Sequence, residues 1–207
     1  AVIDPGQQQM VVTTDILIEE VHFDIQYTPL KHLGYKAVVV NVSDVAAMNA
    51  TPKQITVSIA ISSKYTLEAI EELYVGINAA CKNFNVDLIG GDTTTSPSGL
   101  VISITALRYA SKEDIIYRNT AQINDLICVS GDLGAAYAGL MILDREKQIF
   151  MENNKVQPEL EGYDYVLERQ LKPEPRVDIV GALREAGIKP TSMIDISDGL
   201  SSELIHI

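Results

Sequence analysis

The sequence is poor in cysteine and histidine. Cys81 and Cys128 are the only cysteines, and they stand in separate apolar segments. Two isolated cysteines form neither a disulfide framework nor a metal knuckle. His22, His32 and His206 do not have the spacing of a zinc site. We therefore expect both thiols to be buried core residues of a protein in the reducing cytoplasm.

Long hydrophobic runs are also absent. No stretch approaches the roughly 18 apolar residues of a membrane span. Residues 1–6 have neither the basic nor the apolar region of a signal peptide. The sequence does not begin with Met, and residues 201–207 resemble the start of a helix without a stop signal. We expect the sequence to be part of a longer protein.

Basic residues are scarce relative to acidic ones. The sequence has 16 Lys and Arg against 28 Asp and Glu, which gives a formal net charge of −12. Such a chain would repel nucleic acids and anionic membranes. It would also repel nucleotide phosphates unless metal cations intervene. Taken alone, this charge indicates only solubility.

Several common catalytic motifs are missing. There is no G-x-x-x-x-G-K-[ST] Walker loop, and no G-x-G-x-x-G followed by a kinase catalytic loop or a DFG triplet. The G-x-S-x-G turn of many hydrolases is absent too. A nucleotide-binding function would need a different arrangement, and a site of carboxylates and Mg²⁺ is the best candidate by elimination.

The hydrophobic pattern of the first half predicts an α+β fold. Residues 38–40 favour a strand by propensity, yet the spacing of apolar residues over 30–50 also fits one side of a helix, which we choose. We expect strands at 10–12, 21–25, 55–61, 86–89 and 100–109, and helices at 30–50 and, after a Thr66 cap, 67–81. This β-β-α-β-α-β-β order indicates a mixed layer rather than a Rossmann fold.

A polar stretch at 111–124 predicts a boundary between two domains, 1–115 and 125–207. The second half begins with an apolar segment at 126–130. Gly187 is expected to end the helix that follows Pro173 and Pro175. Further elements are expected as a helix from the turn at 131–134 to 143, charged helical sequence at 145–171, a helix at 177–186, a strand at 193–196 and a helix opened by 197–199.

Aspartates recur where an apolar segment meets Gly, Ser or Thr. They are Asp15, Asp44, Asp92, Asp132, Asp195 and Asp198. Any one of them can be explained as a turn or cap residue; Asp198 fits a helix N-cap, and we interpret Asp132 as a turn residue. For the others the repetition matters, because carboxylates beside buried segments need neutralising partners and basic residues are scarce nearby. Hard oxygen ligands with adjacent hydroxyls suit Mg²⁺.

Four segments resemble the thiamine-monophosphate kinase family, and they occur in that family's order. The stretch Thr13 to Phe23, with the pattern T-D-x-L-x-x-x-V-H-F, is the most selective, whereas Gly-Gly-Asp-Thr is shared by the wider superfamily. The segments are 13–23, 36–48, 90–93 and 195–200, and residues 171–177 match as well.

The resemblance implies a superfamily that includes aminoimidazole ribonucleotide synthetase and selenophosphate synthetase. In it, an N-terminal mixed α/β domain pairs with its copy in a homodimer and builds a shared β-barrel. A second α/β domain, truncated in this sequence, packs beside it. ATP lies between the domains and is held through several Mg²⁺ ions.

The resemblance also assigns roles to individual residues. Asp44 and Asp15 are the expected catalytic residues, and His22 the contact to thiamine monophosphate. From the residues alone, His22 lies on the polar face of its expected strand, Tyr74 on an apolar helix face typical of the core, and Arg118 in a polar linker. The expected Mg²⁺ ligands are Thr13, Thr14, Asp15, Asp44, Asp92, Asp195 and Asp198, and the expected ATP contacts are Tyr74, Gly91, Asp92, Arg118 and Ser197.

The implied reaction is direct in-line transfer of the ATP γ-phosphoryl group to the phosphate of thiamine monophosphate, giving thiamine diphosphate. The acceptor is already anionic, so positioning and charge neutralisation matter more than a general base. The family's Gly-Asp-Asp motif, which would precede Ala1, and its C-terminal thiamine-ring contacts are absent from this sequence.

Two other functions remain open from the sequence. One is another ATP-dependent enzyme of the superfamily, such as selenophosphate synthetase, against which the Val21-His22-Phe23 triplet argues. The other is a non-catalytic module that binds ATP or dimerises.

Overall fold

The computed structural model describes residues 2–3, 6 and 8–207. Five strands of this part of the chain form one mixed sheet. The strands are β1 (Val2–Ile3), β2 (Gln8–Ile18), β3 (Gln54–Ile61), β4 (Asp87–Thr95) and β5 (Leu100–Ser111), in the order β1-β2-β5-β3-β4. Only β3 and β4 pair in parallel; the other neighbours are antiparallel.

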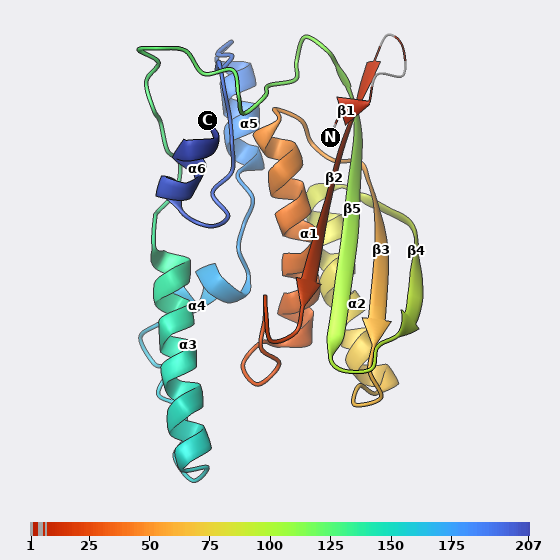
Figure 1. Cartoon of the computed structure of the whole chain (residues 1–207), viewed down its shortest axis with the longest axis vertical. Helices are drawn as coiled ribbons and strands as arrows, with labels where there is room; N and C mark the ends of the chain where they lie inside the picture. Colours follow the sequence, from red (N-terminus) through yellow and green to blue (C-terminus); the bar gives the residue numbers. More distant parts are fainter. Residues whose placement is uncertain (1, 4–5, 7) are drawn as a thin grey trace.

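Two helices, α1 (Leu30–Ala47) and α2 (Leu67–Phe84), cover one face of this sheet (Figure 1). The alternation of β5 sets which side chains meet them: Leu100, Ile102, Ile104 and Ala106 are fully buried, while the residues between them face away. The core therefore lies between the sheet and the two helices. In the described part of the chain no helix covers the other face of the sheet.

Helix α1 is buried on several sides because it lies between the sheet, α2 and the second half of the chain. It meets α2 through two glycines that allow direct backbone contact. A Cβ added at Gly34 would lie 2.0 Å from the carbonyl oxygen of Leu73, and one added at Gly76 would lie 1.9 Å from that of Lys31. Any larger residue at either position would force the helices apart.

The ends of α2 follow from local sequence. The Thr66 side chain accepts a hydrogen bond from the backbone N–H of Ala69 at 3.3 Å, as expected for an N-cap. Asn85 ends the helix in a left-handed conformation with φ of 53°. The predicted cap and helix are thus confirmed.

The second half of the chain contributes four further helices, of which α4 and α5 contact α1 (Figure 1). They are α3 (Ala135–Glu152), α4 (Asp164–Leu171), α5 (Val177–Glu185) and α6 (Leu200–His206). Tyr35 on α1 donates a hydrogen bond to Glu174 at 2.9 Å, which ties the segment between α4 and α5 to α1. The predicted helix at 177–186 is confirmed, and Gly187 follows it with φ of 66°.

The strand predicted at 21–25 is wrong. The chain turns at Glu20, whose φ is 67°, and the N–H groups of Val21 and His22 both bond to the Ile18 carbonyl oxygen. Asp24 then accepts a hydrogen bond from the N–H of Gln26 at 2.8 Å. These local bonds replace the ladder that the alternating pattern would have needed.

Other predictions also need correction. Residues 193–196 form no strand, the strand expected at 86–89 is longer and exposed throughout, and the helical sequence at 145–171 is interrupted between α3 and α4. Cys81 is buried as expected, but Cys128 is exposed. Asp198 does not cap α6; Gly199 occupies that position, and no side chain caps the helix.

No helix in the described part of the chain is both long and apolar enough to cross a membrane.

The contact between α1 and α2 predicts a strong dependence on glycine. Gly76→Ala should lower the free energy of unfolding by about 2–3 kcal/mol, because the new methyl group collides with backbone atoms of α1. Gly181→Ala in α5 is the matched control: its Cβ would meet nothing within 4 Å, so stability should stay the same or rise by up to about 1 kcal/mol. Urea unfolding followed by circular dichroism measures both free energies of unfolding. If Gly76→Ala were as stable as Gly181→Ala, the close packing of α1 against α2 would be contradicted.

Candidate active site

Three of the predicted aspartates lie near one another beside α1. Asp15 lies in the middle of β2, directly opposite Ile104 of β5. Residues in register share a face, and Ile104 is buried under the helices, so Asp15 also points towards them. Asp44 lies in the last part of α1, and Asp195 in the extended segment before α6. None of these is in the turn that the sequence pattern suggested.

Hydroxyl groups hold two of these carboxylates. Thr13, on the same face of β2 as Asp15, donates a hydrogen bond to Asp44. Ser43, beside Asp44 on α1, donates to Asp195 at 2.7 Å. Helix α1 therefore connects β2 to the second half of the chain through two adjacent residues. We refer to Asp15, Asp44 and Asp195 together as the carboxylate cluster.

The carboxylate cluster is electrostatically unfavourable. Burial raises the pKa of all three side chains, and mutual repulsion raises it further: Asp195 acts on Asp15, Asp15 on Asp44, and Asp44 on Asp195. His22 lowers the pKa of Asp15, which places the imidazole near that carboxyl group. Within the described residues, none of the three forms an ion pair with Lys or Arg.

The donor set suits a hard cation such as Mg²⁺, since it combines carboxylates with a threonine hydroxyl. However, no three acidic, histidine or cysteine side chains of the described residues converge closely enough to form a complete metal site. The cluster thus offers charge and oxygen ligands, and bound phosphate oxygens or water would have to complete the coordination.

Thr14 and Asp92 lie on the opposite face of the sheet from the carboxylate cluster. Asp92 of β4 is in register with Ser58 of β3, which pairs with Ser103 of β5, and both of these alternate with core residues. Thr14 bonds to the Thr105 hydroxyl at 3.0 Å on the same exposed face. Two strands separate β4 from β2, a distance of about 14 Å. A single chain therefore does not bring Asp92 into the cluster.

Strand packing explains why position 91 is a glycine. A Cβ there would lie 1.7 Å from the Val57 carbonyl oxygen, so only glycine allows β4 to approach β3 at this point. The predicted ATP contact at Gly91 stays a prediction, but the residue type follows from the strand packing.

The remaining predicted site residues are dispersed. Tyr74 is half-buried on α2, where burial raises the pKa of its phenol, in keeping with the core position that its helix face indicated. Arg118 lies in the segment between β5 and α3, and its carbonyl accepts a hydrogen bond from Ser192 at 2.6 Å. Ser197 and Asp198 are exposed before α6.

Asp132, which we interpreted as a turn residue, has protein partners. The Tyr165 hydroxyl donates to it at 2.7 Å, and Arg169 forms an ion pair with it at 3.3 Å. Both partners lie on α4, so Asp132 fastens the turn before α3 to that helix.

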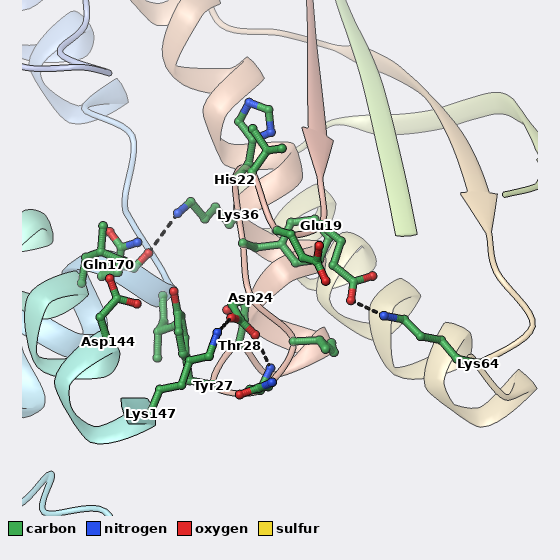
Figure 2. Close-up of a pocket in the computed structure, with 17 residues that line it drawn as sticks. Glu19, His22, Asp24, Tyr27, Thr28, Lys36, Lys64, Asp144, Lys147 and Gln170 are labelled. Atoms are coloured by element: carbon green, nitrogen blue, oxygen red, sulfur yellow. Dashed lines mark hydrogen bonds and ion pairs between the residues drawn. The ribbon is translucent and has the colours of Figure 1, made fainter. Parts of the chain in front are cut away.

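His22 lies in the turn after β2 and not on the strand predicted for it. Its Nδ1 accepts a hydrogen bond from the N–H of Ile18 at 3.0 Å, which leaves Nε2 available. His22 is one of the residues that line a cavity of about 610 Å³ (Figure 2). The loop from Glu19 to Thr28 forms one wall, and α1, α3 and α4 contribute Lys36, Leu140, Asp144, Lys147, Gln170 and Leu171.

Sequence reasoning missed Lys36 and Ser43. They are seven residues apart on α1, a spacing that places both on the same side of a helix and turns them towards the second half of the chain. Polar residues at this spacing on one side of a largely buried helix are a signal that could have identified them.

The chain as a whole is similar to known proteins. A family model described as "AIR synthase related protein, N-terminal domain" matches residues 1–108. The thiamine-monophosphate kinase of Bacillus subtilis is 39% identical over 199 residues, which cover 96% of this chain and 58% of that protein. The chain thus spans about three fifths of the length of the curated relatives it matches.

Solved structures agree with this result. A structure of AaThiL complexed with AMPPCP and TMP superimposes with a TM-score of 0.83 at 29% identity, covering 100% of this chain and 62% of that one. Thiamine-monophosphate kinase from Stenotrophomonas maltophilia gives a TM-score of 0.82 at 34% identity, covering 98% of this chain and 60% of that one.

The superfamily that the four sequence segments indicated is therefore confirmed. Because the family model covers residues 1–108 of 207, this chain belongs to the family of AIR synthase related proteins, whose N-terminal domain it contains.

Proposed function

We propose that this chain is the larger part of a thiamine-monophosphate kinase, which transfers the γ-phosphoryl group of ATP to thiamine monophosphate. The observation that carries the proposal is the carboxylate cluster beside α1, which burial and mutual repulsion leave in need of cations. The relatives of that name support it, as does a neighbouring structure that holds an ATP analogue and TMP.

Different residues of the described part of the chain would bind the metal, orient its ligands and contact the substrate. Asp15, Asp44 and Asp195 would hold Mg²⁺, with Thr13 orienting Asp44 and Ser43 orienting Asp195. When bound, the metal would neutralise the charges of the two phosphate groups that must meet. His22, next to Asp15 and at the edge of the cavity, would contact the acceptor substrate. Thr14 and Asp92 lie on the other face of the sheet, so we leave them out of this group.

The proposal includes a homodimer. The face of the sheet that α1 and α2 leave uncovered carries Thr14, Ile16 and Ser58, and Ile16 is 50% exposed (Figure 1). A second copy could cover this face and close a shared barrel. Two further features also stay predictions: the division into domains 1–115 and 125–207, and the location in the cytoplasm.

Asp44 should be essential for turnover. In the full-length protein, Asp44→Asn should lower the turnover number at least ~100-fold, because one of the three carboxylates of the cluster loses its charge beside the reacting phosphates; this equals ~2.7 kcal/mol of transition-state stabilisation. The rate is measured as the formation of thiamine diphosphate, which is detected by fluorescence after oxidation to its thiochrome. Asp164→Asn, an exposed site on α4, is the control for the same chemical change. Near-normal rates at saturating Mg²⁺ would exclude Asp44 from the mechanism.

His22 should act on the acceptor substrate. His22→Ala should raise the Michaelis constant for thiamine monophosphate about 10-fold while changing that for ATP less than about 3-fold, since a lost charged hydrogen bond costs roughly this much. Steady-state kinetics with each substrate varied in turn separate the two effects. An equal rise of both constants would indicate a general distortion of the site.

Metal binding can be tested without turnover. Mg²⁺ should stabilise this chain by about 1–3 kcal/mol, whereas Asp15→Asn should lose most of that gain. Without metal, the same substitution should raise the free energy of unfolding by about 0.5–1 kcal/mol, because it removes repulsion between partly exposed carboxylates. Thermal denaturation in Mg²⁺ and in EDTA measures both, with Asp164→Asn as control. An unchanged Mg²⁺ effect in Asp15→Asn would refute this site.

A further inference from the structure

The cavity beside His22 contains lysines in two different situations (Figure 2). Lys64 forms an ion pair with Glu19, and Lys147 forms one with Asp24. Both amino groups are therefore neutralised by the protein itself. A ligand that approached either lysine would have to compete with a carboxylate already in place.

Lys36 differs from these two. Its amino group reaches from α1 across the cavity and donates one hydrogen bond, at 3.2 Å, to the main-chain carbonyl oxygen of Gln170 (Figure 2). Among the described residues, no carboxylate lies within ion-pair distance of it. An ammonium group has three donors, and the described residues accept a hydrogen bond from one of them, so two are left for a ligand.

The surroundings of Lys36 make an anionic ligand favourable. Burial lowers the pKa of Lys36, which means that its charge is poorly solvated in the free protein. A phosphate group would supply the missing counter-charge and accept the remaining hydrogen bonds. Lys36 thus places a positive charge at the wall of a polar cavity, and no described carboxylate forms an ion pair with it.

Lys36 lies at a distance from the carboxylate cluster that suits an anion bound between them. It precedes Asp44 by eight residues on α1, which is about 12 Å along the helix axis. His22 lines the same cavity and acts on the pKa of Asp15 in the carboxylate cluster. An anion bound at Lys36 and His22 would therefore face the cluster from the cavity side.

We infer that Lys36 binds the phosphate of the acceptor substrate and thereby selects the phosphorylated substrate over free thiamine. This inference rests on the proposed function, and it adds a specificity-determining residue to it. A charged hydrogen bond of this kind contributes about 10- to 100-fold in affinity.

A structural role is the competing explanation, because the bond from Lys36 to Gln170 also links α1 to α4. The two roles predict different ligand dependence. Loosening the contact between the helices would weaken every ligand of the cavity alike. Loss of a phosphate contact would weaken thiamine monophosphate and leave thiamine, which has no phosphate, unaffected.

Calorimetric titration of the full-length protein with thiamine monophosphate and with thiamine tests the inference. Lys36→Met should reduce the affinity for thiamine monophosphate at least 10-fold and that for thiamine less than 2-fold. Lys36→Gln can keep the hydrogen bond to Gln170 without the charge, and it should give the same loss even if the methionine variant does not fold. Lys31→Met, an exposed site on α1 with the same charge change, should leave both affinities unchanged.

The outcomes separate this inference from the proposed function. Equal weakening of both ligands, or no change, in a Lys36→Gln protein whose parent makes thiamine diphosphate would overturn the role of Lys36 alone. A parent protein that makes no thiamine diphosphate and binds thiamine monophosphate no better than thiamine would overturn the proposed function, and the inference with it. Selective loss for thiamine monophosphate supports both.

Discussion

The direct backbone contact between α1 and α2 is the constraint on which the site depends. Gly34 and Gly76 let the two helices approach until side chains no longer separate them, and this fixes α1 against the sheet. Once α1 is fixed, its other residues have set directions. Asp44 meets Thr13 of β2, while Lys36 and Ser43 meet Gln170 and Asp195 in the second half of the chain. One helix thus positions groups from three parts of the sequence.

The sequence predicts the elements that local chemistry determines. The Thr66 cap, the alternation of β5 and the stop at Gly187 depend on neighbouring residues, so their positions could be predicted. The segment 21–25 has the same alternating pattern as a strand, yet turn bonds around Glu20 and Asp24 prevail there. A period-two pattern records which residues are apolar, but it does not show whether a partner strand is available.

The candidate site was predictable only in part for a similar reason. The repeated aspartates indicated a metal-binding function, and Asp15, Asp44 and Asp195 do lie near one another. Which aspartates share a face of the sheet depends on strand register, which the sequence alone does not give. Asp92 therefore could not be separated from the others in advance. Lys36 was overlooked because a lysine within a helix is usually a solvated surface residue.

Charge is distributed along α1 in a way that suits two phosphate groups. Near its C-terminal end lie carboxylates that repel one another, and two turns earlier lies a lysine without a carboxylate partner among the described residues. Each is costly in the free protein, since burial disfavours both kinds of charge. Neighbouring pairs such as Lys64 and Glu19 are neutralised within the protein. Among the described residues, the fold neutralises some charges and leaves the carboxylate cluster and Lys36 without a partner of opposite charge. Ligands that supply such charges would stabilise it, and a metal-bound nucleotide with an anionic acceptor, as in the proposed function, would supply both kinds.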